Sequence, residues 1–181
     1  NLMRIYFRGF VFGLTGVVVL ALLPLIARDL LAGDSLTFGL LLGAFGVGAV
    51  LGGLTSARIS QTLSNEGMVR VSFLGMALAA AVVSQSTWLA LTMFAVAIAG
   101  AAWVQALALF NTSVQLSTPR WVVGRALSFY QMCTFGGMAF GSWLWGTLVE
   151  THSIEQALQL AAASTLIGVV VGFRWPVPPK M

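Results

Sequence analysis

The amino-acid sequence predicts an all-α membrane protein, a single bundle of six transmembrane helices over residues 1–181. Hydrophobic residues make up 59% of the chain and charged residues only 8%, whereas an ordinary soluble domain has roughly 25% charged residues. The mean hydropathy is +0.95. The charges lie in short clusters between long uncharged runs, which is typical of membrane spans joined by loops. This pattern excludes a water-soluble globule.

The uncharged runs give the positions of the six helices. A helix needs about 20 residues to cross the hydrocarbon core, at about 1.5 Å of rise per residue. The run 71–119 is too long for one helix, and the polar residues from Ser84 to Thr87 are the best place to divide it. The predicted helices cover about 9–27, 35–57, 68–84, 88–111, 126–149 and 156–173.

The first helix follows two basic residues, Arg4 and Arg8. A positive stretch before an apolar run also begins a secretory signal peptide, so a cleaved signal is the alternative. The apolar run is long for a signal, and residues 23–27 show no small-residue cleavage pattern. We therefore interpret the run as a true span.

Glycines lie on narrow arcs of the first two helices. Because little hydrophobic force draws helices together in lipid, close backbone approach at small residues provides the contacts. Each arc is therefore predicted to be a groove for a neighbouring helix. The arcs consist of Gly9, Gly13 and Gly16 in the first helix, and of Gly39, Gly43, Gly46 and Gly53 in the second.

A weak internal similarity joins the second and fifth helices. Residues 45–49 and 135–139 both begin with Phe-Gly and end with Ala. Each lies in the middle helix of a set of three, and these two helices cross the membrane in opposite directions. The similarity therefore predicts a 3+3 inverted repeat.

The basic residues predict the orientation in the membrane. Eight of the nine fall on one side if the first helix starts in the cytoplasm, and Arg28 alone falls on the other. Both termini are therefore expected in the cytoplasm of a multi-pass protein of the cell inner (plasma) membrane. The cytoplasmic set is Arg4, Arg8, Arg58, Arg70, Arg120, Arg125, Arg174 and Lys180. These residues are scattered rather than gathered in a patch, so no nucleic-acid partner is expected.

Ionisable groups are nearly absent from the predicted spans. Only Arg70 lies at the mouth of one, so a proton relay within this chain is not expected. A membrane-embedded hydrolase pairing Ser142 with His152 is the alternative, but the two lie at different depths. We expect no enzyme activity, no cofactor and no metal site. Cys133 is the single cysteine, so no internal disulfide can form.

Neutral polar side chains are the candidate substrate-binding residues. Ser128, Gln131 and Thr134 recur every three residues on one face of the fifth helix. Gln105 is an amide deep in the fourth helix, and Thr15 of the first is a weaker candidate. Such a polar face needs either hydrogen bonds to a neighbouring helix or a water-filled cavity, and the sequence leaves both open.

Several stretches resemble a known family. They are the loop 114–128 with Gly124-Arg125-Ala126 at its centre, the following residues 129–132, 135–139, 141–142 and 144–146, and near the start 22–30 and 38–41. Together they resemble the C-terminal six-helix half of a major facilitator superfamily transporter. The likeness is greatest to the transmembrane secretion effector group, which includes the enterobactin exporter.

The resemblance implies an architecture and a function. The first and fourth helices would line a central cavity, the second and fifth would face an N-terminal six-helix half that is not in this sequence, and the third and sixth would be outermost. The chain would form half of a secondary active exporter of small amphipathic molecules, siderophore- or drug-like, working by alternating access. The alternative is a non-transporting six-span scaffold or partner subunit.

Overall fold

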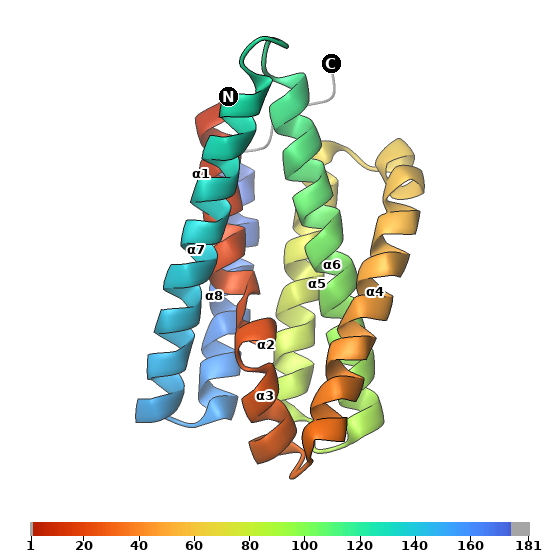
Figure 1. The fold of residues 1–181 in the computed structure, drawn as a ribbon, viewed down its shortest axis with the longest axis vertical. Coiled ribbons are helices and arrows are strands. Elements are labelled where there is room, and N and C mark those ends of the chain that lie inside the picture. Colours follow the sequence, from red (N-terminus) through yellow and green to blue (C-terminus); the bar gives the residue numbers. More distant parts are fainter. Residues whose placement is uncertain (1, 175–181) are drawn as a thin grey trace.

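The computed structural model describes residues 2–174, and over these residues it is helical with short connections. Figure 1 shows two groups of long helices side by side, α1, α7 and α8 in one and α4, α5 and α6 in the other. The elements are α1 (Leu2–Gly16), α2 (Val18–Ala21), α3 (Leu23–Leu25), the π-helical η1 (Ile26–Leu30), α4 (Ser35–Thr62), α5 (Asn65–Gln85), α6 (Leu89–Leu116), α7 (Val123–Thr151) and α8 (Ile154–Arg174).

Four segments are long and apolar enough to cross a membrane. They are Leu2–Leu30, Ser35–Ser56, Asn65–Gln85 and Leu89–Leu116. α8 adds a shorter apolar stretch, Ile154–Val170, and the 29 residues of α7 include the predicted polar face. The predicted helical fold is thus confirmed for the described residues. Of the six predicted spans, four are confirmed as candidates, and the spans at α7 and α8, like the inverted repeat, stay predictions.

Polar caps place the helix ends beyond the apolar runs. A carboxylate oxygen of Asp34 accepts hydrogen bonds from the backbone N–H groups of Leu36 and Thr37, both at 3.1 Å, before α4. The Ser64 hydroxyl oxygen accepts one from Gly67 N–H at 3.1 Å before α5. Since hydrogen bonds rather than hydrophobicity define a helix start, α5 begins at Asn65 instead of about residue 68.

The first predicted helix, about 9–27, lies within the single candidate span Leu2–Leu30, which the structure divides into shorter helical pieces. This span begins at Leu2, and α1 ends at Gly16. Pro24 lacks the N–H of a regular helix, and its ring crowds the preceding turn. The segment ends in the π-helical η1, after which Ala32 takes a left-handed φ of 48°.

Glycines hold two helix pairs together by backbone contact. In the α1–α7 pair, Gly13 lies against the backbone of Thr134, and Gly137 lies against the carbonyl of Phe10. In the α4–α6 pair, the contacts occur at Gly48 and Gly52 of α4, which lie against Ala97 and Ala101, and at Gly100 of α6, which lies against the carbonyl of Phe45. A methyl group at these glycines would collide with backbone.

The two predicted glycine arcs have different outcomes. The first is confirmed, because Gly9 and Gly13 pack on α7 and Gly16 packs on the Trp103 ring. The second stays a prediction for its main members, since no described atom lies within 4 Å of a Cβ built on Gly39, Gly43 or Gly46. Helical periodicity shows which residues share an arc, but α6 packs on the neighbouring arc of α4.

Candidate substrate-binding surfaces

Gln105 lies inside the bundle where α6 meets α4. It is 9% exposed, and its Nε2 donates to the hydroxyl of Thr55 on α4 at 3.5 Å. This separation is at the long limit for a hydrogen bond. The Thr55 hydroxyl in turn donates to the backbone carbonyl of Leu51 at 2.7 Å. The Gln105 amide therefore joins the two helices only weakly.

One helical turn beyond Gln105, a cavity of about 510 Å³ opens between α4, α5 and α6. We call it the α4–α6 cleft. Uncharged polar residues and apolar residues line it together: the polar ones are Ser56, Ser60, Asn65, Thr112 and Ser113, and the others are Gly53, Met68, Ala108, Leu109 and Leu116. Its lining residues Ser60 and Asn65 place the cleft where α4 ends and α5 begins.

The predicted polar face of α7 is divided between two environments. Ser128 and Gln131 are exposed on the outside of the bundle, and the Ser128 hydroxyl donates to the Gly124 carbonyl at 2.9 Å. Thr134 is instead 2% exposed and lies against Gly9 of α1. Residues three apart rotate by about 60° around a helix, so the third member of the set has turned toward the packed side.

Thr15 is buried within the first helix. It is 3% exposed, and its hydroxyl donates to the Val11 carbonyl one turn back at 3.0 Å. The structure therefore does not bring the five candidates together. Gln105 lies beside the cleft, Ser128 and Gln131 lie on the outer face of α7, and Thr15 and Thr134 lie in the packed interior.

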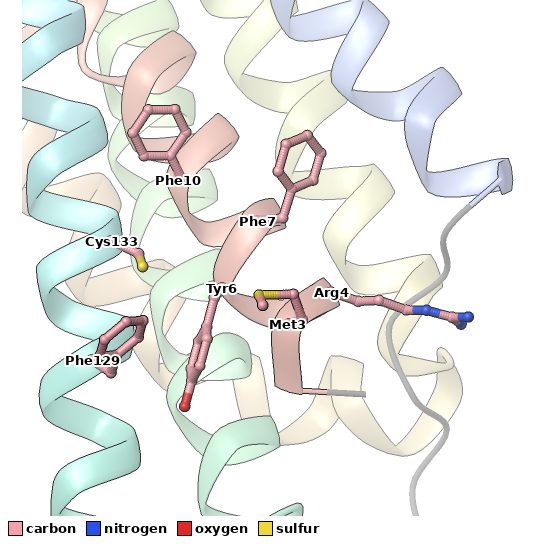
Figure 2. Close-up of a pocket in the computed structure, with 7 residues that line it drawn as sticks. All are labelled: Met3, Arg4, Tyr6, Phe7, Phe10, Phe129 and Cys133. Carbon is pink, nitrogen blue, oxygen red and sulfur yellow. The ribbon is translucent and has the colours of Figure 1, made fainter.

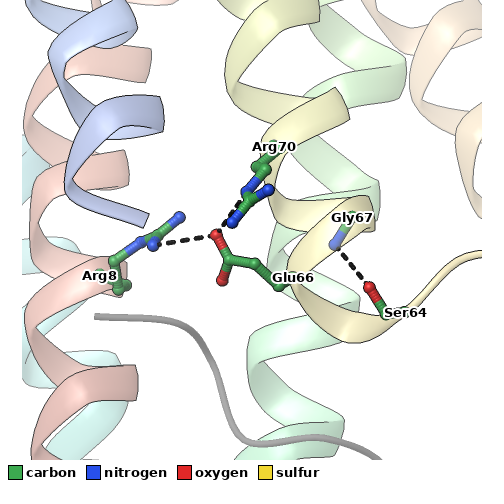
Figure 3. Close-up of polar contacts among 5 residues, drawn as sticks. All are labelled: Arg8, Ser64, Glu66, Gly67 and Arg70. Atoms are coloured by element: carbon green, nitrogen blue, oxygen red, sulfur yellow. Dashed lines mark hydrogen bonds and ion pairs between the residues drawn. The ribbon is translucent and has the colours of Figure 1, made fainter. Parts of the chain in front are cut away.

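A charged cluster, which the sequence analysis missed, joins α1 to α5 (Figure 3). One carboxylate oxygen of Glu66 accepts from Arg8 Nη1 at 3.3 Å and from Arg70 Nε at 3.1 Å. The Arg8 side chain is 1% exposed, and its guanidinium lies 5.4 Å from the centre of the Phe73 ring. Arg8 and Glu66 lie within the candidate spans Leu2–Leu30 and Asn65–Gln85, which corrects the expectation that Arg70 would be the only ionisable residue in a span.

Two sequence signals point to this cluster in hindsight. Glu66 follows the capping residue Ser64, so it belongs to the first turn of α5, and it precedes Arg70 by four residues, a spacing that favours ion pairs on a helix. The partnership with Arg8 spans 58 positions in the sequence, and no local pattern indicates it.

A second cavity of about 510 Å³ forms an apolar groove between α1 and α7 (Figure 2). Its aromatic members include Tyr6 and Phe129, whose ring centres are 5.5 Å apart. The Tyr6 hydroxyl donates to the Ala126 carbonyl at 3.2 Å. Figure 2 shows the Arg4 guanidinium pointing away from the groove. Met3, Phe7, Phe10 and Cys133 complete the lining.

The alternative hydrolase pairing does not occur. Ser142 and His152 lie ten residues apart on and just after α7, about 15 Å along the axis. The His152 Nδ1 is 2.9 Å from the Thr151 hydroxyl instead.

Comparison with known proteins decides the family. A family model described as transmembrane secretion effector matches residues 1–181. The chain belongs to this family of major facilitator superfamily transporters. It is also similar to human solute carrier family 67 member A1, with 32% identity over 157 residues that cover 84% of this chain and 37% of the human protein. The chain thus spans less than two thirds of this curated relative, and it is a membrane protein of a transporter family.

Proposed function

We propose that this chain forms the C-terminal half of a secondary active exporter of small amphipathic molecules, siderophore- or drug-like, that works by alternating access against an N-terminal six-helix half. One observation carries the proposal: α4 and α7 present small and polar residues on outer faces that nothing in residues 2–174 covers. Gln131 and Ser128 of α7 are exposed, and Gly43 and Gly46 of α4 have open space beside them.

These faces favour a protein partner over lipid. Polar side chains against hydrocarbon forgo hydrogen bonds, while small residues allow another helix to approach closely. The two residues that correspond in the predicted repeat, Gly46 and Gly136, are both open in this way. The family implies the same arrangement, with the second and fifth long segments facing the other half and the first and fourth lining the cavity.

The orientation is part of the proposal. The N-terminus, the α4–α5 connection and the α6–α7 connection lie at one end of the bundle (Figure 1), and the basic residues there favour the cytoplasm. Lys180, counted on this side, lies outside the described residues. Single cysteines in a Cys133→Ser background test this. Gly33→Cys and Thr151→Cys should react with an impermeant reagent added outside intact cells, whereas Pro119→Cys should be shielded, and the reverse pattern contradicts the orientation.

The transport function is tested in the full-length protein with a neutral amphipathic dye, Nile red. Gln105→Leu and Gln131→Leu should each slow dye efflux from cells, since both amides can hydrogen-bond a solute without a buried charge. Gln159→Leu, an exposed amide on α8, is the matched control and should efflux at the wild-type rate. Normal efflux by the double variant Gln105→Leu/Gln131→Leu, at normal abundance, contradicts the assignment of these residues.

The same assay separates a half-transporter from a complete one. The 181-residue chain alone in vesicles should not move the dye above the lipid background, because a cavity between two bundles has only one wall when one bundle is missing. Dye flux by this chain alone overturns the proposed division into halves.

A further inference from the structure

The groove between α1 and α7, which we call the α1–α7 groove, is an apolar cavity at the surface of the bundle (Figure 2). Phe129 in its lining is 51% exposed and Met3 is 77% exposed. The Tyr6 hydroxyl is already used, since it donates to the Ala126 carbonyl at 3.2 Å. The surface left for an occupant therefore consists mainly of aromatic rings and hydrocarbon, which suits an acyl chain better than a polar solute.

Basic residues lie at one end of this groove. Arg4 contributes to the lining, while its guanidinium points away from the rings (Figure 2). On α7, Arg125, Phe129 and Cys133 recur every four residues, so they follow one flank of the helix. Because α1 and α7 both begin at the same end of the bundle (Figure 1), Arg4 and Arg125 lie at the same end of the groove. An apolar groove with cations at one end matches an amphiphile with an anionic head.

The other charges of the chain leave these two arginines available to an anion. Neither Arg4 nor Arg125 makes an ion pair with a described residue. Glu66 is the acidic residue at this end of the bundle, and it binds Arg8 and Arg70 in the interior. The remaining acidic residues belong to the opposite end (Figure 1): Asp29, Asp34, Glu150 and Glu155. An anionic head at the groove therefore meets cations without a competing carboxylate among the described residues.

The groove lies on the flank of α7 that is turned away from the proposed contact with the other half. That contact involves Ser128 and Gln131. At about 100° per residue, the mean direction of Phe129 and Cys133 is roughly 150° from the mean direction of those two polar residues. A second bundle that packs on Ser128 and Gln131 thus leaves the groove facing the membrane, so lipid is the occupant that can reach it.

We propose that the α1–α7 groove binds an acyl chain of an anionic glycerophospholipid from the surrounding membrane, with Arg4 and Arg125 contacting the phosphate of its head. The distance fits, because Arg125 and Cys133 are about 12 Å apart along α7, less than the roughly 15 Å of hydrocarbon in one leaflet. A zwitterionic lipid binds less well, because its own ammonium group offsets the charge of its phosphate. This site goes beyond the proposed function, since lipid binding does not require transport.

The test uses the full-length protein in phosphatidylcholine nanodiscs with a trace of photoreactive lipid. The probe is phosphatidylglycerol with a diazirine in the middle of one acyl chain, and phosphatidylcholine with the same chains is the control lipid. Mass spectrometry of peptides locates the attached lipid after irradiation. We expect phosphatidylglycerol to label residues 3–10 and 129–133 at least fivefold more than phosphatidylcholine does, because one basic residue near an anionic head is worth about fivefold in affinity.

Two outcomes of this comparison overturn the proposal. Equal labelling of the groove by both lipids means that it holds ordinary acyl chains without selecting a head. Absence of labelling at residues 3–10 and 129–133 by either lipid means that another protein segment covers the groove. Efflux is not measured here, so failure of the lipid site and failure of the transport assay are separate results.

Arginine variants test the head contact. Arg4→Gln and Arg125→Gln should each lower labelling of the groove by phosphatidylglycerol about fivefold and leave labelling by phosphatidylcholine unchanged. Arg120→Gln is the matched control, since Arg120 is exposed in the connection before α7 but does not line the groove. It should be labelled like the wild type. An equal loss in all three variants shows a general attraction of anionic lipid to this end of the protein and contradicts the site.

A last pair of experiments tests the chain contact and the identity of the occupant. Cys133→Trp places a ring in the groove and should lower labelling by phosphatidylglycerol at residues 3–10 at least fivefold, whereas Cys133→Ser should be labelled like the wild type. Unchanged labelling in Cys133→Trp, with a melting temperature equal to that of the wild type, contradicts the chain contact. Displacement of phosphatidylglycerol by excess Nile red means that the groove binds a transported solute and overturns its assignment to lipid.

Discussion

The two helix pairs α1–α7 and α4–α6 both pack through glycines, but they differ in the side-chain hydrogen bonds between the two helices. In both, the helices run in the same direction and glycines lie against the partner backbone (Figure 1). The α1–α7 pair adds two hydrogen bonds from side chain to backbone, Trp145 Nε1 to the Leu14 carbonyl at 2.8 Å and Tyr6 to the Ala126 carbonyl. Across α4–α6, Gln105 Nε2 donates to the Thr55 hydroxyl at 3.5 Å.

This difference separates the contribution of glycine contacts from that of hydrogen bonds between the helices. Glycine contacts set the closest approach at the middle of each pair, but hydrogen bonds on both sides of that point hold the α1–α7 helices together along their length. In the α4–α6 pair, the bond from Gln105 to Thr55 lies about one helical turn from the cleft. The two pairs therefore share close backbone contact at glycine and differ in the side-chain hydrogen bonds that accompany it. Four measurements test this comparison, from the largest expected effect to the smallest.

The largest effect is expected for Glu66→Ala, because the Glu66 carboxylate joins α5 to α1 through its ion pair with Arg8. Removing one partner of a buried ion pair typically costs about 3–5 kcal/mol, and Arg8 stays buried. Glu155→Ala is the control, since Glu155 occupies the first turn of α8 in the same way but is exposed. Its free energy of unfolding should stay within about 0.5 kcal/mol of wild type. Denaturation by dodecyl sulfate in mixed micelles measures the free energy of unfolding of both variants. Equal losses in this free energy contradict the role of the Arg8–Glu66 ion pair.

The glycine contacts come next. Gly137→Ala and Gly100→Ala should each lower the free energy of unfolding by about 1–3 kcal/mol, because each methyl meets a backbone carbonyl of the partner helix. Gly136→Ala and Gly43→Ala have open space at the same kind of position and should be neutral or stabilising by up to about 1 kcal/mol. If all four variants unfold alike, close packing is not what joins the pairs.

The hydrogen bonds give a smaller effect. Trp145→Phe should cost about 1 kcal/mol, since it removes a well-formed bond from a ring that is 3% exposed. Gln105→Leu should cost roughly 0.5 kcal/mol, near the average for bonds between membrane helices. Trp143→Phe, at a ring that is 62% exposed, is the control and should unfold like the wild type. A larger loss of unfolding free energy for Gln105→Leu than for Trp145→Phe would mean that the hydrogen bond across α4–α6 is the stronger one, which contradicts this prediction.

The smallest effect concerns pH and the turn that joins the two groups of helices. The backbone N–H of Thr37, followed by its hydroxyl and the N–H of Leu36, lowers the pKa of Asp34 below its usual value. A lowered folded pKa means that this stabilisation is present above the unfolded value of about 3.9 and is lost as the pH falls through the folded value. Melting temperatures between pH 7 and pH 3 should therefore decline slightly more in wild type than in Asp34→Asn, which caps without titrating. Parallel curves contradict this role of the Asp34 charge.

The sequence by itself determined that this protein lies in a membrane and where its helices lie along the chain. Long uncharged runs cannot be hydrated, and a helix is the local solution that satisfies every backbone group within such a run. The polar residues after Ser84 marked the connection between α5 and α6, and Gly124-Arg125-Ala126 with its neighbours indicated the family that the comparison confirms. Each of these features lies within a few consecutive residues.

Only the tertiary structure decided which faces meet. Gly48 and Gly43 lie on one helix, yet the first packs on α6 and the second is open. Thr134 and Gln131 are three residues apart, yet only Thr134 is buried. The Arg8 to Glu66 pair and the cleft at Ser113 join separate helices. The physical reason is that helical periodicity defines angles within one helix, whereas the rotation and crossing of two helices depend on all their side chains at once.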